Sequence, residues 1–317
     1  MIRSIAHINA TQIAIIFLSI ILFSTCDSDS FEEINNPNSR EYKKLEVDQE
    51  DKELVKIKAN SVKERRIFSR FTENVIKSGG KEVLAETIRF DIEGNKKEQY
   101  RFNSTSVNVQ WLYDYDEYGN LKSIEEYDGY QSLLKRTIYN NRSNGLLLDK
   151  REEMKKSNTY YEYNYDDSLN LVSVNLFNND RVLFSKYLYK YEEKKLDSVI
   201  LYRNNLVSAK FLFEYDSQGR RKSESIISKQ SPARVINYEY DDVGNLVLVD
   251  NKRLTKIEYT YNDNGDITEE KIYNSAGDFQ SRTTFTYDLE TGLLSEKTRY
   301  DGLDRPALEI RYEYDFY

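Results

Sequence analysis

The sequence predicts an all-β protein built from tandem β-hairpin repeats, which form a long antiparallel meander or a solenoid-like twisted sheet. The first observation is composition: the 317 residues include 27 tyrosines and 32% charged residues but only 3 prolines. Such a chain suits half-exposed strands better than buried helices. The second is a motif that recurs about every 25 residues, and the third is the alternation of aromatic and polar residues before each copy of it.

The recurring motif is an aromatic residue, here called the anchor, followed by Asp or Asn and a turn. Its clearest copies are YDEYGNL from Tyr115 and YDDVGNL from Tyr240, and successive anchors lie 21 to 27 residues apart. A fixed period of this length indicates a repeat protein. Weaker half-anchors start at Tyr127, Tyr273 and Tyr300. The ten predicted anchors are Phe90, Tyr115, Tyr139, Tyr165, Tyr191, Tyr215, Tyr240, Tyr261, Tyr287 and Tyr314.

The residues before each anchor alternate with a period of two, which indicates strands. Ile236, Tyr238 and Tyr240 share one face, and Glu239 between them belongs to the other. Similar alternation precedes most of the other anchors. We therefore expect one aromatic face that packs and one polar face that meets water.

The residues after each anchor predict a type I turn closed by a glycine bulge. Asp116 can accept hydrogen bonds from backbone N–H groups two residues on, and Gly119 can adopt the left-handed conformation. A β-branched residue at Gly119 or Gly244 should strain its hairpin by roughly 1–2 kcal/mol. The predicted turn glycines are Gly119, Gly219, Gly244, Gly265 and Gly292.

These anchors resemble the Rhs/YD-repeat family, whose motif is Y-x-Y-D-x-x-G-x-L, and the match covers residues 88–317. The resemblance implies extended β-sheet, which in that family spirals into shells or cell-surface filaments, often with a C-terminal toxin domain. Because the sequence ends inside an anchor at Tyr314, we expect no toxin domain here. A short scaffold or binding surface is then a better expectation than a shell around a cargo.

The N-terminus predicts export and lipid attachment. Arg3 precedes an apolar run, Ile13 to Phe23, that is too short to span a bilayer. The following residues, up to Cys26, resemble the lipobox of bacterial lipoproteins, which implies a lipidated Cys26. The alternative is a plain signal peptide with an incidental cysteine. We predict a signal peptide at 1–25, a disordered acidic tether at 26–53, an N-terminal cap or first hairpin at 54–87 and the repeat domain at 88–317.

Residue types argue against enzymatic, metal and cofactor chemistry. The only histidine, His7, lies in the predicted signal peptide, and Cys26 is the only cysteine. Catalytic triads, zinc sites and cofactor sites are therefore not expected. The carboxylates of Glu125 and Glu126 are adjacent in a strand and point to opposite faces. A formal charge of −8 argues against nucleic acid as a partner.

The sequence therefore predicts a non-catalytic, lipid-anchored scaffold or binding protein of the bacterial envelope, in the outer membrane, with an envelope protein or a glycan as partner. The aromatic face either packs or stacks on flat ligands, and packing is favoured. Trp111 is the one aromatic residue we single out as a candidate contact, although core packing is the better expectation for it too. Two alternatives stay open. One is an envelope enzyme that acts on polysaccharide through a carboxylate pair. The other is an outer-membrane β-barrel, which Lys135 and Arg136 oppose because they point to opposite faces.

Overall fold

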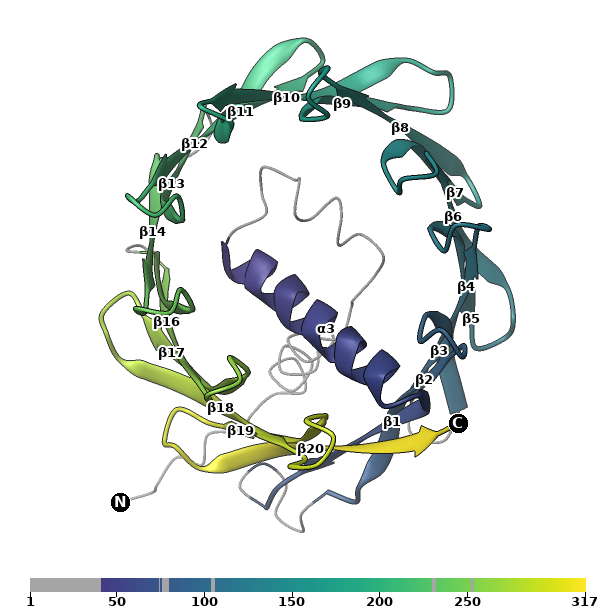
Figure 1. The fold of residues 1–317 in the computed structure, drawn as a ribbon, viewed down its shortest axis with the longest axis vertical. Coiled ribbons are helices and arrows are strands. Elements are labelled where there is room, and N and C mark those ends of the chain that lie inside the picture. The colour runs from purple at the N-terminus through teal and green to yellow at the C-terminus, as the bar shows by residue number, and fades with distance from the viewer. Residues whose placement is uncertain (1–40, 74, 76–79, 104–105, 230–231, 252–253) are drawn as a thin grey trace, which may run out of the picture.

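A closed antiparallel β-barrel with one helix inside it makes up the part of the chain that the computed structural model describes, residues 41–73, 75, 80–103, 106–229, 232–251 and 254–317 (Figure 1). The helix is α3 (Glu41–Ala59). The strands are β1 (Val62–Phe71), β2 (Val83–Phe90), β3 (Lys96–Asn103), β4 (Ser106–Tyr115), β5 (Leu121–Asp128), β6 (Leu133–Asn141), β7 (Leu147–Met154), β8 (Ser157–Tyr165), β9 (Leu171–Phe177), β10 (Leu183–Glu192), β11 (Lys195–Arg203), β12 (Leu206–Tyr215), β13 (Arg221–Ser228), β14 (Arg234–Tyr240), β15 (Leu246–Asn251), β16 (Thr255–Tyr261), β17 (Ile267–Asn274), β18 (Phe279–Tyr287), β19 (Leu294–Tyr300) and β20 (Pro306–Phe316).

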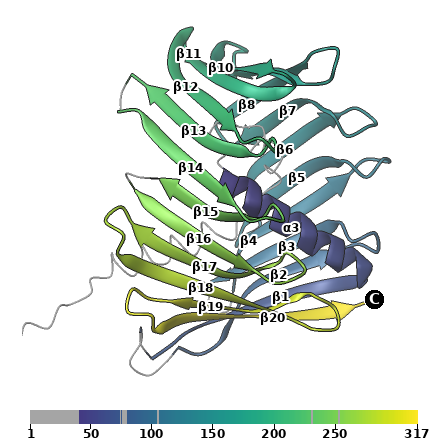
Figure 2. The same ribbon diagram turned by 60° about the vertical axis from the view of Figure 1, so that its left-hand side comes forward.

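The prediction of an open meander or solenoid is wrong, because the two ends of the sheet pair with each other. Each strand pairs with the next one in the sequence, and β1 pairs with β20 to close a 20-stranded barrel of radius 19 Å. In this pairing Arg65 lies opposite Tyr314, Ile67 opposite Tyr312 and Ser69 opposite Ile310. Closure gives partners to the N–H and C=O groups that an open sheet leaves bare at its edges. The strands are strongly tilted, as a closed barrel requires (Figure 2).

The segment before residue 88 also differs from the prediction. Residues 41–53 were assigned to the disordered tether but belong to α3, while residues 26–40 lie outside the described part of the chain. In the segment predicted as a cap or first hairpin, β1 and the beginning of β2 do form an antiparallel hairpin. This hairpin does not cap an open edge, since β1 is the strand that closes the barrel.

Alternation along each strand sorts the side chains into a lumenal face and an outer face. α3 lies inside the ring, and its Leu45 packs with Tyr238, Val249 and Tyr259 (Figure 1). The aromatic positions before the anchors are therefore lumenal. The residues between them, such as Glu239, point outward, as the sequence predicted.

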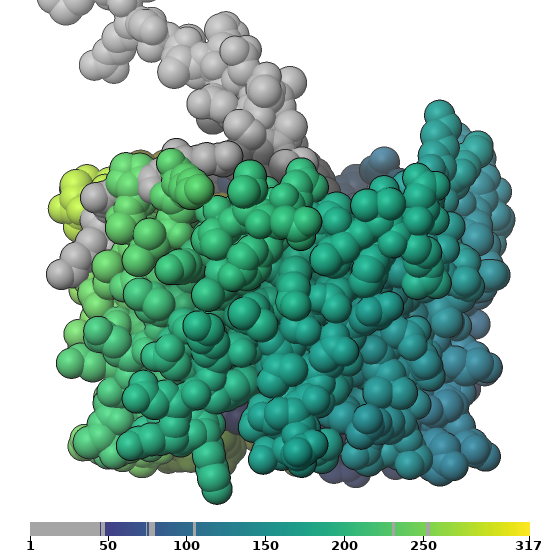
Figure 3. Space-filling view, turned by 90° about the horizontal axis from the view of Figure 1, so that it is seen from above, coloured from purple at the N-terminus to yellow at the C-terminus, as the bar shows by residue number. Residues whose placement is uncertain are grey.

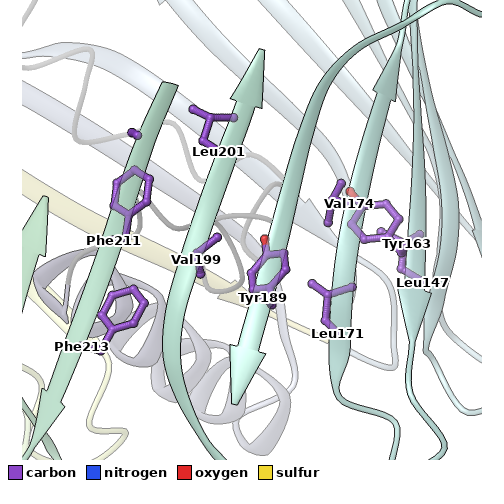
Figure 4. Packing of buried hydrophobic residues seen from close by; sticks show 10 residues of the cluster. Leu147, Tyr163, Leu171, Val174, Tyr189, Val199, Leu201, Phe211 and Phe213 are labelled. Carbon is purple, nitrogen blue, oxygen red and sulfur yellow. The ribbon is translucent and has the colours of Figure 1, made fainter. Parts of the chain in front are cut away.

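The core is a layer of buried side chains on the lumenal side of the wall. Its largest cluster runs across β7 to β12, where Tyr189, Val199 and Phe211 are neighbours in consecutive strands (Figure 4). A second cluster joins β14–β17 to Leu45, and a third surrounds Ile57 at the end of α3. Each cross-strand pair of this kind contributes about 0.2–1 kcal/mol, so the wall is stabilised by many small terms.

Candidate functional site in the barrel lumen

The anchor tyrosines form a repeated hydrogen-bonded row around one mouth of the barrel, here called the anchor mouth. Seven anchor hydroxyls donate to a backbone carbonyl at the beginning of a strand in the preceding hairpin. For example, Tyr261 donates to Leu246 O at 2.6 Å and Tyr287 to Ile267 O at 2.9 Å. The same bond is made by Tyr165, Tyr191, Tyr215, Tyr240 and Tyr314. Burial raises the pKa of five of these phenols, those of Tyr165, Tyr191, Tyr261, Tyr287 and Tyr314, and brings that of Tyr165 to about 12.

The turns at the anchor mouth have the predicted chemistry. Asp116 Oδ1 accepts hydrogen bonds from the N–H groups of Tyr118 and Asn120, both at 2.9 Å, and Gly119 N–H donates to Asp116 O. Gly119 has a φ of +80°. The other four predicted turn glycines also have positive φ, which confirms their left-handed conformation. The side chain of Asn120 and two backbone N–H groups lower the pKa of Asp116.

Two predicted anchors, Tyr139 and Tyr191, are not followed directly by an Asp or Asn turn of this kind. In the β6–β7 hairpin Asn141, and not Tyr139, directly precedes the turn, and its Nδ2 donates to Leu121 O at 2.8 Å as the anchor hydroxyls do elsewhere. Tyr139 lies two residues too early, so that assignment is wrong. Tyr191 is an anchor without the Asp turn, because Glu193 and Lys194 form a two-residue turn with positive φ at both residues.

The helix α3 lies at the anchor mouth and is held there largely by polar contacts. Lys52 Nζ donates to Gly265 O and Lys56 Nζ to Asp266 Oδ1, each at 2.8 Å. Tyr314 OH donates to Glu53 Oε1 at 2.9 Å. On the opposite side Lys96 Nζ donates to Glu50 at 2.5 Å. The contacted turns and strands belong to the arc from β14 through β20 to β3.

The C-terminal end of α3 is the more firmly packed end. Ile57 is 1% exposed and lies among Val62, Ile88 and Leu293, whereas Leu45 is the buried residue described in the first half of the helix. Asn60 Nδ2 donates to Thr291 O at 3.1 Å just beyond the helix. The chain therefore passes from α3 into β1 through a well-packed segment.

The lumenal face of the arc from β4 to β13, here called the β4–β13 arc, mixes tyrosines with charges. Lys150, whose side chain is fully buried, donates to Glu152 Oε1 at 2.9 Å, and its Nζ lies 4.3 Å from the ring centre of Tyr161. Lys135 Nζ lies 3.3 Å from the same carboxylate. Burial opposes ionisation of Glu152, but the two ammonium groups together lower its pKa. The β4–β13 arc therefore has half-buried rings beside charged groups.

Trp111, the candidate contact for which core packing was the better expectation, belongs to the β4–β13 arc and is 6% exposed. Its ring lies beneath the guanidinium of Arg101, with 5.0 Å from Cζ to the ring centre. It is therefore part of the packed wall. Tyr161 also faces the lumen and is half-buried, so its ring is more accessible than that of Trp111. The repeat pattern alone does not distinguish accessible rings from packed ones.

The outer wall carries ion pairs at mid-strand positions. Arg136 and Glu125 lie opposite each other on β6 and β5, with 2.5 Å between Nη2 and Oε1. Glu126, next to Glu125, lies opposite Lys135 on the lumenal side, so this carboxylate pair is split between the two faces as predicted. A membrane-spanning barrel needs an outward apolar band about 25 Å tall. In the described wall, outward charges interrupt any such band.

Other site types find no support in the described residues. Within them no group of three or more His, Cys, Asp or Glu side chains is arranged to hold a metal ion. No described helix combines the length and apolar character that a membrane crossing requires. Cys26, the predicted lipidation site, lies outside the described residues.

Comparison with known proteins finds similar solved structures but no family. A porin-like protein from Bacteroides uniformis is 10% identical, with 80% of this chain and 98% of that chain covered and a TM-score of 0.37. A porin-like protein from Bacteroides vulgatus is 9% identical, with 79% and 97% covered and a TM-score of 0.31. The TcdB2–TccC3 structure is 14% identical, with 73% of this chain but 15% of that chain covered and a TM-score of 0.37. No protein-family model and no curated protein matches the chain. Membership of the Rhs/YD-repeat family therefore stays a prediction.

Proposed function

We propose that this chain is a non-catalytic binding barrel of the bacterial cell envelope, which holds a glycan chain against the β4–β13 arc of its lumen. The observation that carries the proposal is the composition of this arc, where half-buried tyrosines lie beside Lys135 and Glu152. Tyrosine rings stack on sugar faces while neighbouring charged groups bind hydroxyls.

Neighbouring tyrosines on β8 provide a matched test, because Tyr161 faces the lumen and Tyr160 faces outward beneath Arg181. We would titrate the purified chain with chitohexaose and with maltohexaose by isothermal calorimetry. Loss of one stacking ring costs about 1–1.5 kcal/mol, so Tyr161→Ala should weaken binding about tenfold. Tyr160→Ala should leave it unchanged. Absence of binding, or equal loss in both variants, would refute a lumenal glycan site.

The lipid anchor is a separate part of the proposal and rests on the lipobox-like segment before Cys26. Expressed in a bacterium, the wild-type chain should enter the membrane fraction, and Cys26→Ser should move it to the soluble fraction. A Cys26→Ser protein that stays with the membrane would rule out attachment through this residue.

An outer-membrane pore is the second candidate, and closure of the barrel is the observation that favours it. The outward ion pairs, such as Arg136 with Glu125, oppose it. Conductance steps in a planar bilayer would support the pore and would contradict a wall that faces water.

A further inference from the structure

One region of the outer wall differs from the rest because it is apolar. Figure 3 shows this side of the barrel, with β9 to β13 in the middle of the view, as a continuous surface. The region is here called the apolar patch. Its outward side chains are Phe184, Leu188, Ile200, Leu212, Ile227 and Val235, on β10 to β14.

The strand registers make the patch continuous. Leu188 lies opposite Ile200 across β10 and β11, and Ile227 lies opposite Lys210 across β13 and β12. Leu212 is 40% exposed, and Ile227 and Val235 are each 43% exposed. At outward positions on β16 to β18, by contrast, the wall has Glu258, Lys271 and Arg282. Several exposed aliphatic side chains on neighbouring strands indicate an interaction surface.

Two lysines within the apolar patch give it positive charge. Lys186 lies opposite Tyr202, and Lys210 lies opposite Ile200, so both ammonium groups emerge among apolar side chains. Among the described residues, neither lysine has an acidic group within ion-pair distance, whereas Lys256, Lys271 and Arg282 elsewhere on the wall each have one.

Acidic side chains border the patch. Asp197 and Glu214, toward the anchor mouth, accept hydrogen bonds from Ser198 and Ser223. Glu162 on β8 lies in line with Lys186, because both are opposite Asn175 of β9. The patch therefore has two lysines around its apolar centre, on a protein whose net charge is −8.

We propose that the apolar patch docks an acidic protein segment, whose aliphatic side chains cover Ile200 and Leu212 while its carboxylates pair with Lys186 and Lys210. Charge complementarity favours this partner. Two lysines beside apolar side chains are complementary to a segment that has carboxylates beside apolar side chains. A second copy of the chain would bring like charges together if the two patches met. This surface is on the opposite side of the wall from the lumenal site, so it does not depend on the glycan proposal.

The test uses two synthetic fluorescent peptides of alternating residues, one of Leu and Glu and one of Leu and Lys, together with vesicles of anionic lipid. The Leu–Glu peptide should bind the full chain in an anisotropy titration, and added salt should weaken binding. Lys186→Glu with Lys210→Glu should weaken it tenfold or more, since each reversed charge faces a carboxylate. The control is Lys155→Glu with Lys156→Glu, two exposed lysines of the β7–β8 turn, which should leave it unchanged.

Three results would overturn the proposal. One is equal weakening by both double variants, which would mean that net charge alone drives binding. Another is equal binding of the Leu–Lys peptide. The last is binding to anionic vesicles without binding to the Leu–Glu peptide, which would assign the patch to a membrane surface. Circular dichroism of each variant shows whether it keeps the wild-type fold, and Leu212→Ser provides a second variant without a charge reversal.

Discussion

Gly119 provides a quantitative test of the turn chemistry that most hairpins at the anchor mouth share. Its φ is +80°, and an added Cβ would meet nothing within 4 Å. Substitution therefore costs backbone strain and no collision. For Gly119→Val we expect a loss of about 1–2 kcal/mol in the free energy of unfolding, because side chains with a Cβ disfavour the left-handed conformation. For Gly119→Asn the loss should be clearly smaller, since Asn tolerates that conformation.

The assay is urea unfolding followed by far-ultraviolet circular dichroism. If all variants show the same dependence of the unfolding free energy on urea concentration, one common slope is used to compare them. Gly129→Ala is an informative companion, because its φ is not in the left-handed region and its added Cβ would lie 2.4 Å from Val107 O. That variant should lose stability through steric conflict. If Gly119→Val and Gly119→Asn cost the same, the left-handed turn assigned to Gly119 is wrong.

Three further predictions concern the anchor tyrosines and α3. Tyr261→Phe removes the hydroxyl that donates to Leu246 O and should cost about 1 kcal/mol in urea unfolding; no loss would show that the bond contributes nothing. Lys56→Met leaves the carboxylate of Asp266, 5% exposed, without its ammonium partner. It should cost about 1–3 kcal/mol and speed amide exchange in α3, and unchanged exchange would contradict the docking. Burial raises the pKa of Tyr165 from 10 to about 12, so its phenol ionises first in the unfolded chain. The stability that this phenol contributes is therefore fully present below pH 10 and is lost as pH rises from 10 through about 12. Tyr165→Phe should reduce the fall in the free energy of unfolding over that pH range.

Strands and turns could be predicted because their signals are local. The alternation of Ile236, Tyr238 and Tyr240 identifies a face, and Asp116 with Gly119 specifies a turn. Each of these depends on neighbours within a few residues. The misassigned anchor at Tyr139 shows the limit, since nothing in the motif indicated that Asn141 takes the place of a tyrosine.

Closure of the barrel could not be predicted because it depends on the sum of small rotations between twenty strands. Neither Arg65 nor Tyr314 carries a local mark of being the partner of the other. The pairing follows only when the accumulated curvature brings the first strand to the last.

The helix α3 was missed because its sequence lacks a regular apolar stripe. Leu45, Leu54 and Ile57 are its described apolar contacts with the wall, and charged residues occupy most of the other positions. Isolated, such a segment resembles a solvated tether. Its helix is stabilised by groups such as Gly265 and Asp266, which lie more than 200 residues away in the sequence.

Pairing of β1 with β20 is the central structural claim, and disulfide formation between the two strands tests it most directly. In a Cys26→Ser background, cysteines at Arg66 and Glu313, which lie opposite each other, should form a disulfide on oxidation. Cysteines at Glu258 and Lys271, which lie opposite each other on consecutive strands, provide the control. A closed barrel predicts cross-linking of both pairs in the monomer. Cross-linking of the control pair alone would show that the sheet is open and would contradict the account.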